Sequence, residues 1–333
     1  MNDNVLVTCG GKWVGMVLHL KRAMRAIPSL ADGELIVADK DAVTPAGSFA
    51  DGAEIVPPID DEHYVDALLE ACERRSVRVL IPIIDSDLVR LVQHSARFES
   101  IGTALMAPPS GLVQLCFDKD EFQDFATLHG LAMPRRYRPA ELDDAIYPLF
   151  YKSPTGFGSV GSGICETPRQ AHEALTGSPG LIFQEYVVAA EVSVDGFVST
   201  SGRCTVRVQR ERDKVVGGES WRSHTISDPD VGDLAQRTMD ALVGKGFHGP
   251  LNIQIFRTDP LQLIEVNTRL GSASVLSNVA SAGRLYEAAL QEACGGTVDG
   301  DPDDYIVGLH LYRYLGDIYH DGSSVLQDFS DPR

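Results

Sequence analysis

The sequence lacks the features that identify membrane-spanning, secreted and zinc-binding proteins. No apolar run in its 333 residues approaches the length needed to cross a membrane, and the N-terminus leads directly into a strand rather than an apolar leader. Cysteine is scarce, and the six residues form neither a Cys-x-x-Cys pair nor a cluster with histidine at zinc-ligand spacing: Cys9, Cys72, Cys116, Cys165, Cys204 and Cys294. We therefore expect a cytoplasmic protein with reduced thiols, without a membrane span or a signal peptide.

Positive charge is also scarce. The chain has 29 Lys and Arg against 47 Asp and Glu, which gives a net charge of -18 at pH 7. Nucleic acids and anionic membrane surfaces bind basic protein surfaces, so we expect neither as a partner. The 44% of hydrophobic residues and 23% of charged residues are typical of a globular protein long enough for two or three compact units.

The first 107 residues alternate short apolar segments with segments of helical periodicity. The pattern predicts helices over residues 16–26 and 63–74, and strands over residues 4–8, 34–38 and 77–82. Alternation at this spacing is typical of a parallel sheet with helices on both faces. We therefore predict a Rossmann-like domain over residues 1–107, and a homodimer through this domain is a working hypothesis.

The loops that follow these strands hold two candidate ligand sites. The glycine-rich turn at residues 9–15, with Asp39 downstream, raises a dinucleotide-binding hypothesis, but its glycines lack the Gly-x-Gly-x-x-Gly spacing. Those glycines can instead let the turn pack closely against the sheet. Asp85 and Asp87 follow another strand, where such folds place ligands, although capping of the next helix explains them equally well.

A proline- and glycine-rich break at residues 107–111 separates this domain from the next part of the chain. We predict a helix that Asp118 caps, with Phe122, Phe125 and Leu128 as its apolar stripe. Lys119 falls in the first turn, where the helix dipole disfavours a cation. That position favours a functional role, with an ordinary surface lysine as the alternative.

The next apolar strand, residues 147–152, ends at Lys152 and leads into a glycine-rich loop over residues 153–163. The loop contains a Gly-x-Gly-x-x-Gly match, but no helix is expected directly after it, and it lacks the Gly-Lys-Ser/Thr ending of a P-loop. We interpret it as a flap whose backbone N–H groups, and Ser159 among its side chains, can cover phosphates. A purely structural hairpin loop is the alternative.

Residues 181–187 form another apolar strand that carries Gln184, Glu185, Tyr186 and Val187. Apolar walls with a backbone donor and acceptor suit an adenine ring, so this strand is a candidate nucleotide site. Glu191 follows it, and its carboxylate can accept hydrogen bonds from ribose hydroxyls.

The most specific stretch is a predicted hairpin of residues 251–256 and 261–269, joined by a turn that contains proline. Side chains two residues apart on a strand share a face, so Glu265 and Asn267 point the same way and Gln254 can join them. A carboxylate with two amide oxygens suits a hard cation such as Mg²⁺, and Arg269 can then meet a phosphate. The alternative is the polar outer face of an amphipathic hairpin.

In order along the chain, the two lysines, the glycine loop, the 184–187 strand with its following glutamate and the acidic hairpin resemble the ATP-grasp superfamily. The resemblance covers nearly the whole chain and depends on order and spacing rather than on any single motif. It implies an α/β and α+β fold in which the nucleotide lies between two sheets. Residues 108–187 would form the lid and central subdomain, and residues 188–333 the C-terminal subdomain with the metal site.

The resemblance also implies a role for each candidate nucleotide contact. Lys119 and Lys152 would contact the phosphates of ATP, with Ser159 in the flap above them. The hinge residues 184–187 would hold the adenine, and Glu191 would hold the ribose.

The hairpin residues receive their roles in the same way. Gln254, Glu265 and Asn267 would bind Mg²⁺, with Mn²⁺ as an alternative, and Arg269 would face the transferred phosphoryl group. Glutamine at the first metal position is similar to carbamoyl phosphate synthetase and its relatives.

The densest basic segment, residues 204–214, is a further candidate because an arginine directed into the site can hold a carboxylate or a phosphate. We favour Arg210 over Arg207 and Arg212 for this role, since several of these side chains must be solvated. His224 is a weaker candidate general base, and an ordinary polar loop histidine is the alternative. A helix over residues 284–294 and a last strand over residues 305–314 are expected to complete the fold, with no amidotransferase or carrier domain.

The resemblance implies an ATP-dependent carboxylate–amine ligase that joins small molecules, with amino acids as the expected substrates. A carboxylate would attack the γ-phosphoryl group of ATP, and an amine would then attack the acyl phosphate, so Arg269, Arg210 and Lys152 are the catalytic candidates. Two alternatives remain open at this stage. One is a kinase of a small carboxylate resembling carbamoyl phosphate synthetase, and the other is a nucleotide-binding regulator or an NAD-dependent oxidoreductase.

Overall fold

The computed structural model describes residues 3–156, 161–320 and 325–326, and its first unit is a five-stranded sheet. The sheet has the order β3-β2-β1-β4-β5, and all its pairs are parallel. Its strands are β1 (Asn4–Thr8), β2 (Leu35–Asp39), β3 (Gly52–Ile55), β4 (Val77–Pro82) and β5 (Ala104–Leu105). Near-continuous apolar runs such as those of β1 and β4 are typical of parallel strands that are buried on both faces.

Helices cover both faces of this sheet. Val5 and Val7 belong to the apolar core that contains helix α1, whereas Leu6, between them, belongs to the core that contains α3. The helices of this unit are α1 (Val14–Ala26), α2 (Pro45–Phe49), α3 (Tyr64–Arg74), α4 (Asp85–Leu91) and α5 (Ser95–Ser100), with the 3-10 helix η1 (Val92–His94). The predicted parallel sheet with helices on both faces is confirmed.

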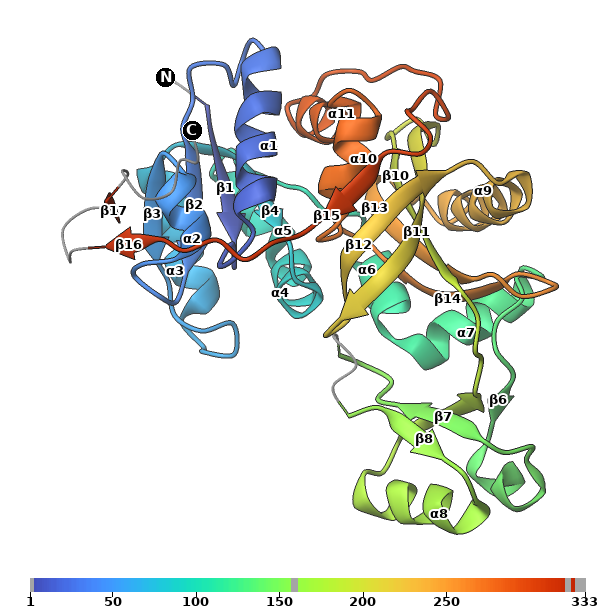
Figure 1. Cartoon of the computed structure of the whole chain (residues 1–333). Coiled ribbons are helices and arrows are strands. Elements are labelled where there is room, and N and C mark those ends of the chain that lie inside the picture. The colour runs from blue at the N-terminus through green and yellow to red at the C-terminus, as the bar shows by residue number, and fades with distance from the viewer. Residues whose placement is uncertain (1–2, 157–160, 321–324, 327–333) are drawn as a thin grey trace.

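A small antiparallel sheet follows, with the order β6-β9-β7-β8, and Figure 1 shows it as a lobe below the main body. Its strands are β6 (Arg136–Tyr137), β7 (Leu149–Lys152), β8 (Gly163–Cys165) and β9 (Ile182–Glu185). The helices of this part of the chain are α6 (Ser110–Phe117), α7 (Lys119–Leu128) and α8 (Pro168–Gly177), with the 3-10 helix η2 (Pro139–Asp144). The glycine-rich loop joins β7 to β8, as expected for a hairpin flap.

The largest sheet has six strands in the order β14-β13-β10-β11-β12-β15, and every pair in it is antiparallel. Its strands are β10 (Glu191–Val198), β11 (Cys204–Val216), β12 (Glu219–Ile226), β13 (Gly249–Phe256), β14 (Gln262–Asn267) and β15 (His310–Tyr312). The remaining elements are α9 (Pro229–Val243), α10 (Ser274–Ala280), α11 (Arg284–Ala293) and a terminal pair, β16 (Tyr319–His320) and β17 (Val325–Leu326).

Two apolar cores attach the neighbouring elements to this large sheet. One joins α1 to α11 and to β10 and β11 through Phe197, Val206 and Tyr286, so the N-terminal unit packs against the sheet. The other joins α6, α7 and α9 to β10 and β13. The lobe of β6 to β9 has its own small core around Phe183. The proposed domain boundaries at residues 107 and 187 stay predictions.

Three local predictions were wrong. Leu128 is 79% exposed rather than part of the apolar stripe of α7. Neither Asp85 nor Asp87 caps α4, whose N-cap residue is Ile84. The last strand covers only residues 310–312 of the expected 305–314, because β15 pairs with β12 over just that stretch. Within the described ranges, no helix combines the length and apolar character needed to cross a membrane.

Candidate active site

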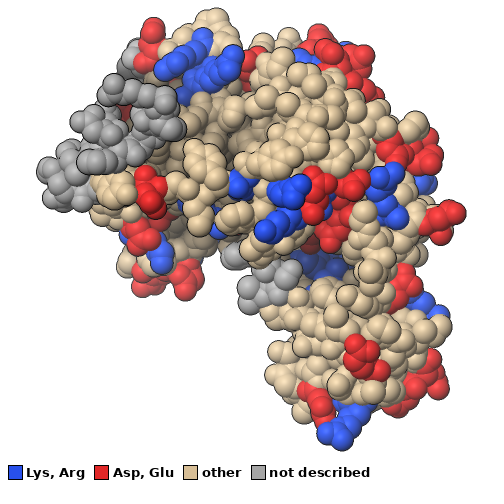
Figure 2. All heavy atoms as spheres, in the orientation of Figure 1, with Lys and Arg blue, Asp and Glu red and all other residues tan. Residues whose placement is uncertain are grey.

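One cavity of about 490 Å³ lies where the small sheet, the large sheet and α4 meet. The favoured nucleotide, metal and catalytic candidates that the structure describes all line it: Lys119, Lys152, Gln184, Glu185, Tyr186, Val187, Glu191, Arg210, Gln254, Glu265, Asn267 and Arg269. Ser159 lies outside the described residues. Figure 2 shows Lys and Arg side chains in the hollow between the lobe and the main body, although the chain as a whole is acidic.

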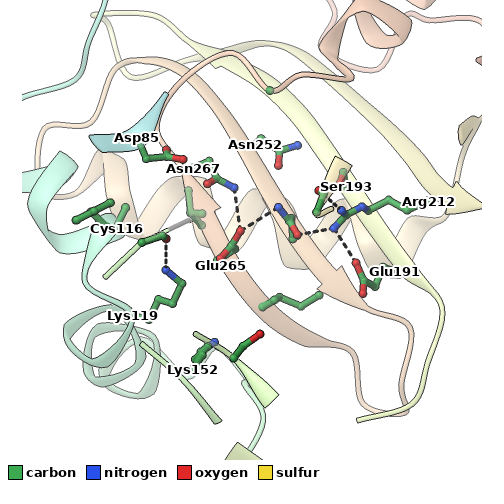
Figure 3. A pocket seen from close by; sticks show the side chains of 18 of the residues that line it. Asp85, Cys116, Lys119, Lys152, Glu191, Ser193, Arg212, Asn252, Glu265 and Asn267 are labelled. Atoms are coloured by element: carbon green, nitrogen blue, oxygen red, sulfur yellow. Dashed lines mark hydrogen bonds and ion pairs between the residues drawn. The ribbon is translucent and has the colours of Figure 1, made fainter. Parts of the chain in front are cut away.

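Two lysines reach the cavity from two elements. Lys119 is the first residue of α7, which Asp118 caps through the backbone N–H groups of residues 120 and 121, and its Nζ donates to the Gly156 carbonyl at 2.9 Å. Lys152 is the last residue of β7. Burial lowers the pKa of Lys152 to about 8, against the opposing effect of Glu265. Figure 3 shows both lysines across from Glu265. This arrangement suits an anion that lies between the two lysines on one side and a cation bound at Glu265 on the other.

The strand β9 contributes backbone rather than free side chains. Gln184 is buried and donates from Nε2 to Gln123 Oε1 at 2.8 Å, and Glu185 Oε1 accepts from Gln262 Nε2 at 2.8 Å. These bonds fix the strand to α7 and to the hairpin. The backbone of residues 185–187 is therefore the part of the strand that can meet a planar ring.

The hairpin of β13 and β14 brings its polar residues together as expected. Gln254 is the direct partner of Glu265 in the register, and Glu265 Oε1 accepts from Gln254 Nε2 at 3.1 Å and from Asn267 Nδ2 at 3.3 Å. Half a rotation of the Asn267 amide exchanges its nitrogen for its oxygen, so this oxygen and the Glu265 carboxylate can face one point, whereas Arg212 holds the Gln254 amide in place. This donor set fits Mg²⁺.

Arg212 is central to this site, although the sequence favoured Arg210. Its Nη1 donates to Gln254 Oε1 and to Glu191 Oε2, both at 2.7 Å, as Figure 3 shows. Arg210 also lines the cavity, but its Nε donates to the buried Asp195 at 2.8 Å. Arg210 therefore neutralises an interior carboxylate, while Arg212 links the candidate ribose and metal residues.

Arg269 connects the hairpin to the N-terminal unit. Its Nη2 lies 2.5 Å from Asp85 Oδ2, at the first turn of α4, and 3.5 Å from Asn267 Oδ1. Its Nε is buried and has no hydrogen-bond partner among the described residues. Because Arg269 lines the cavity, an incoming anion could satisfy this unpaired donor.

Two family models match the chain. The PylC-like N-terminal domain matches residues 5–106, and the ATP-grasp domain matches residues 116–273. The chain contains an ATP-grasp domain. Among curated protein sequences, none matches it.

Solved structures share the ATP-grasp fold at low identity. A biotin carboxylase from Campylobacter jejuni in a β-γ-ATP complex has a TM-score of 0.75 and 14% identity, over 92% of this chain and 74% of that chain. An L-amino acid ligase from Bacillus licheniformis has a TM-score of 0.68 and 16% identity, over 89% of this chain and 75% of that chain. A third neighbour is the biotin carboxylase domain dimer of Hydrogenobacter thermophilus 2-oxoglutarate carboxylase, in complex with MgADP, ADP and bicarbonate. It has a TM-score of 0.75 and 12% identity, over 93% of this chain and 74% of that chain.

Other candidates lie outside the cavity of this ATP-grasp protein. Arg207 pairs with Asp303 and also donates to Gln236 on α9. His224 lies on β12, not in a loop, and pairs with Asp213.

The glycine-rich turn after β1 is shaped by packing. A Cβ at Gly10 would lie 2.7 Å from Val37 Cγ1, too close for any side chain. Asp39 Oδ2 accepts from the Gly11 N–H at 3.0 Å. Both contacts support the packing interpretation of the turn.

Proposed function

We propose that this protein is an ATP-dependent carboxylate–amine ligase that forms an amide or peptide bond between small molecules through an acyl phosphate. The observation that carries the proposal is the cavity in which Lys119 and Lys152 lie across from Glu265 and Asn267. Cations on one side and hard-metal ligands on the other are what a triphosphate requires.

In this proposal ATP lies between the two sheets. The adenine contacts the backbone of residues 185–187, and Glu191 accepts from the ribose hydroxyls while it keeps its bond to Arg212. Lys119 and Lys152 neutralise the phosphates from the lobe side.

The hairpin is the proposed metal site. Glu265 and Asn267 would hold Mg²⁺ or Mn²⁺, which when bound supplies charge neutralisation to the phosphates. Gln254 would contribute less, because its Oε1 already accepts from Arg212 at 2.7 Å. This contact favours one strongly bound ion over two.

The chemistry needs positioning and charge rather than a protein nucleophile. A substrate carboxylate oxygen attacks the γ-phosphorus, a new O–P bond forms and the bond to ADP breaks. Arg269 would approach the transferred group, since its orphaned Nε can donate to an anion. An amine then attacks the acyl carbon, the C–N bond forms, and phosphate leaves as the amine releases a proton. The flap between β7 and β8 would exclude water from the anhydride.

Amino acids are the substrates that we propose for the first tests. The structural neighbour from Bacillus licheniformis is an L-amino acid ligase, and the unpartnered Nε of Arg269 in this cavity suits a small carboxylate.

The test is ATP turnover by the purified protein with Mg²⁺ and a matrix of amino acids and amines, read as ADP release and product mass. We expect stoichiometric ADP and a new C–N product with at least one pair. Lys152→Ala and Glu265→Gln should remove turnover while the variants stay folded, and Lys21→Ala, a lysine paired with Asp51 outside the cavity, should retain it. ADP without a C–N product would replace the ligase with a carboxylate kinase, and no ADP with any pair would refute the proposal.

A further inference from the structure

A second cluster of metal-type ligands lies on the large sheet, outside the ATP-grasp cavity. Asp213 on β11, His224 on β12 and His310 on β15 come from three neighbouring strands, seen side by side in Figure 1. None of the three lines the cavity, whereas Arg210 and Arg212 of the same strand do. Because strand side chains alternate between faces, the cluster lies on the opposite face of the sheet.

The sheet register brings these residues together. His224 and His310 are direct cross-strand partners, and so are His224 and Glu211. Between Glu211 and Lys214, β11 has one residue more than the facing segment of β12, and Asp213 lies in this irregular segment. A bulge of this kind redirects a side chain, and here the Asp213 carboxylate reaches the ring of His224.

The potential ligand atoms of the three residues lie close together. His224 Nδ1 lies 2.9 Å from Asp213 Oδ1 and 3.1 Å from Oδ2. The His224 and His310 rings are stacked at 5.2 Å between centroids, and the potential ligand atoms of all three residues lie within 4.8 Å of one another. Zn²⁺ in tetrahedral coordination requires ligand atoms about 3.3 Å apart, and rotation of the exposed His310 side chain would close that difference.

Another aspartate–histidine pair in this chain differs from the cluster of Asp213, His224 and His310. His172 lies 3.0 Å from Asp143 across the surface of the lobe, but among the described residues this pair has no third ligand beside it. At His224 a second imidazole from an edge strand stacks on the first. Two imidazoles and one carboxylate are ligands that Zn²⁺ prefers, whereas the oxygen and amide donors of the cavity suit Mg²⁺.

We propose that Asp213, His224 and His310 form a Zn²⁺ site that fastens the edge strand β15 to β11 and β12. β15 pairs with β12 over only three residues, so such a link would hold the weakest strand of the sheet. It would also restrain the irregular segment of β11 beside Arg212, whose side chain contacts Gln254 and Glu191 on the other face.

Calorimetric titration of Zn²⁺ into tag-free, chelator-treated protein, with excess Mg²⁺ to occupy the cavity, tests the site. We expect one Zn²⁺ per chain, and at least tenfold weaker binding in His310→Ala and in Asp213→Asn. The matched control is His172→Ala, which removes the other aspartate–histidine pair and should bind Zn²⁺ as the wild type does. Absence of Zn²⁺ binding in the wild type, or equal affinity in His310→Ala, overturns the proposal.

Thermal unfolding separates loss of the site from loss of the fold. His310 is exposed, so His310→Ala should melt at the wild-type temperature when metal-free. Added Zn²⁺ should raise the melting temperature of the wild type and of His172→Ala, but not that of His310→Ala. An equal rise in His310→Ala would assign the metal to another part of the chain and refute the site.

Discussion

Replacing Lys152 with methionine should stabilise the nucleotide-free protein while it removes ATP turnover. The buried ammonium has a pKa of about 8 instead of its usual 10.5, because burial disfavours its charged form. This lowering of the pKa corresponds to a destabilisation of at most about 3 kcal/mol at neutral pH. Solvent reaches part of the side chain, so we expect a gain of about 1 kcal/mol in the free energy of unfolding.

The sign of the pH dependence follows from the lowered pKa. Below about pH 8 the lysine is charged in the folded and the unfolded chain, so the folded wild type bears the full cost of burial. Between about pH 8 and 10.5 the folded lysine releases its proton while the unfolded lysine keeps it, and wild-type stability rises. The advantage of Lys152→Met should therefore be largest at neutral pH and vanish near pH 10.5.

Urea unfolding without nucleotide, at about pH 7 and about pH 10, measures this difference. Lys21→Met is the control, because Lys21 makes an ion pair with Asp51 outside the cavity and should give no gain. Mg²⁺ and ATP should reverse the order and favour the wild type. A loss of stability in Lys152→Met at neutral pH, or a gain that does not change with pH, would contradict the placement of a charged lysine in this cavity.

Three further substitutions test the proposed roles. Arg212→Met, which removes both 2.7 Å hydrogen bonds to the proposed ribose and metal residues, should raise the KM for ATP about tenfold in steady-state assays, and an unchanged KM would refute its role. Asp85→Asn should lower kcat/KM for the carboxylate about tenfold with little effect on nucleotide affinity, because it loosens Arg269; equal losses for both substrates would argue against this. Gln254→Ala should raise the Mg²⁺ concentration at half-maximal turnover roughly threefold. Glu265→Gln should raise the Mg²⁺ concentration needed for half-maximal nucleotide binding roughly tenfold or more. Equal shifts in the two variants would contradict one dominant metal ligand.

The regular parts of the fold could be predicted because their sequence pattern is strong. Buried apolar runs such as those of β1 and β4 indicate strands, whereas β3 and β5, at four and two residues, are too short to give a clear pattern. Leu128 shows how a stripe can be misread. It lies about 120° from Phe122 around the helix axis, on the exposed side, whereas Phe122 and Phe125 are buried.

Part of the candidate site could likewise be predicted from the sequence, and part could not. Two-residue periodicity predicted that Glu265 and Asn267 would share a face, and the register of β13 and β14 brings Gln254 beside them. The choice between Arg210 and Arg212 depended on Asp195, a buried carboxylate on the neighbouring strand that the pattern of residues 204–214 does not reveal. The Asp85 to Arg269 contact joins residues 184 positions apart, so only the tertiary structure could show it.

Transfer of ¹⁸O from the carboxylate substrate to phosphate tests the central claim most directly. The carboxylate substrate is labelled with ¹⁸O at both oxygens. If it attacks the γ-phosphoryl group and the acyl phosphate then reacts with the amine, one labelled oxygen leaves in inorganic phosphate as ADP and the amide form. Mass spectrometry should therefore find one ¹⁸O in each phosphate released. Label in AMP, or unlabelled phosphate beside a completed amide, would contradict an acyl phosphate route in this cavity.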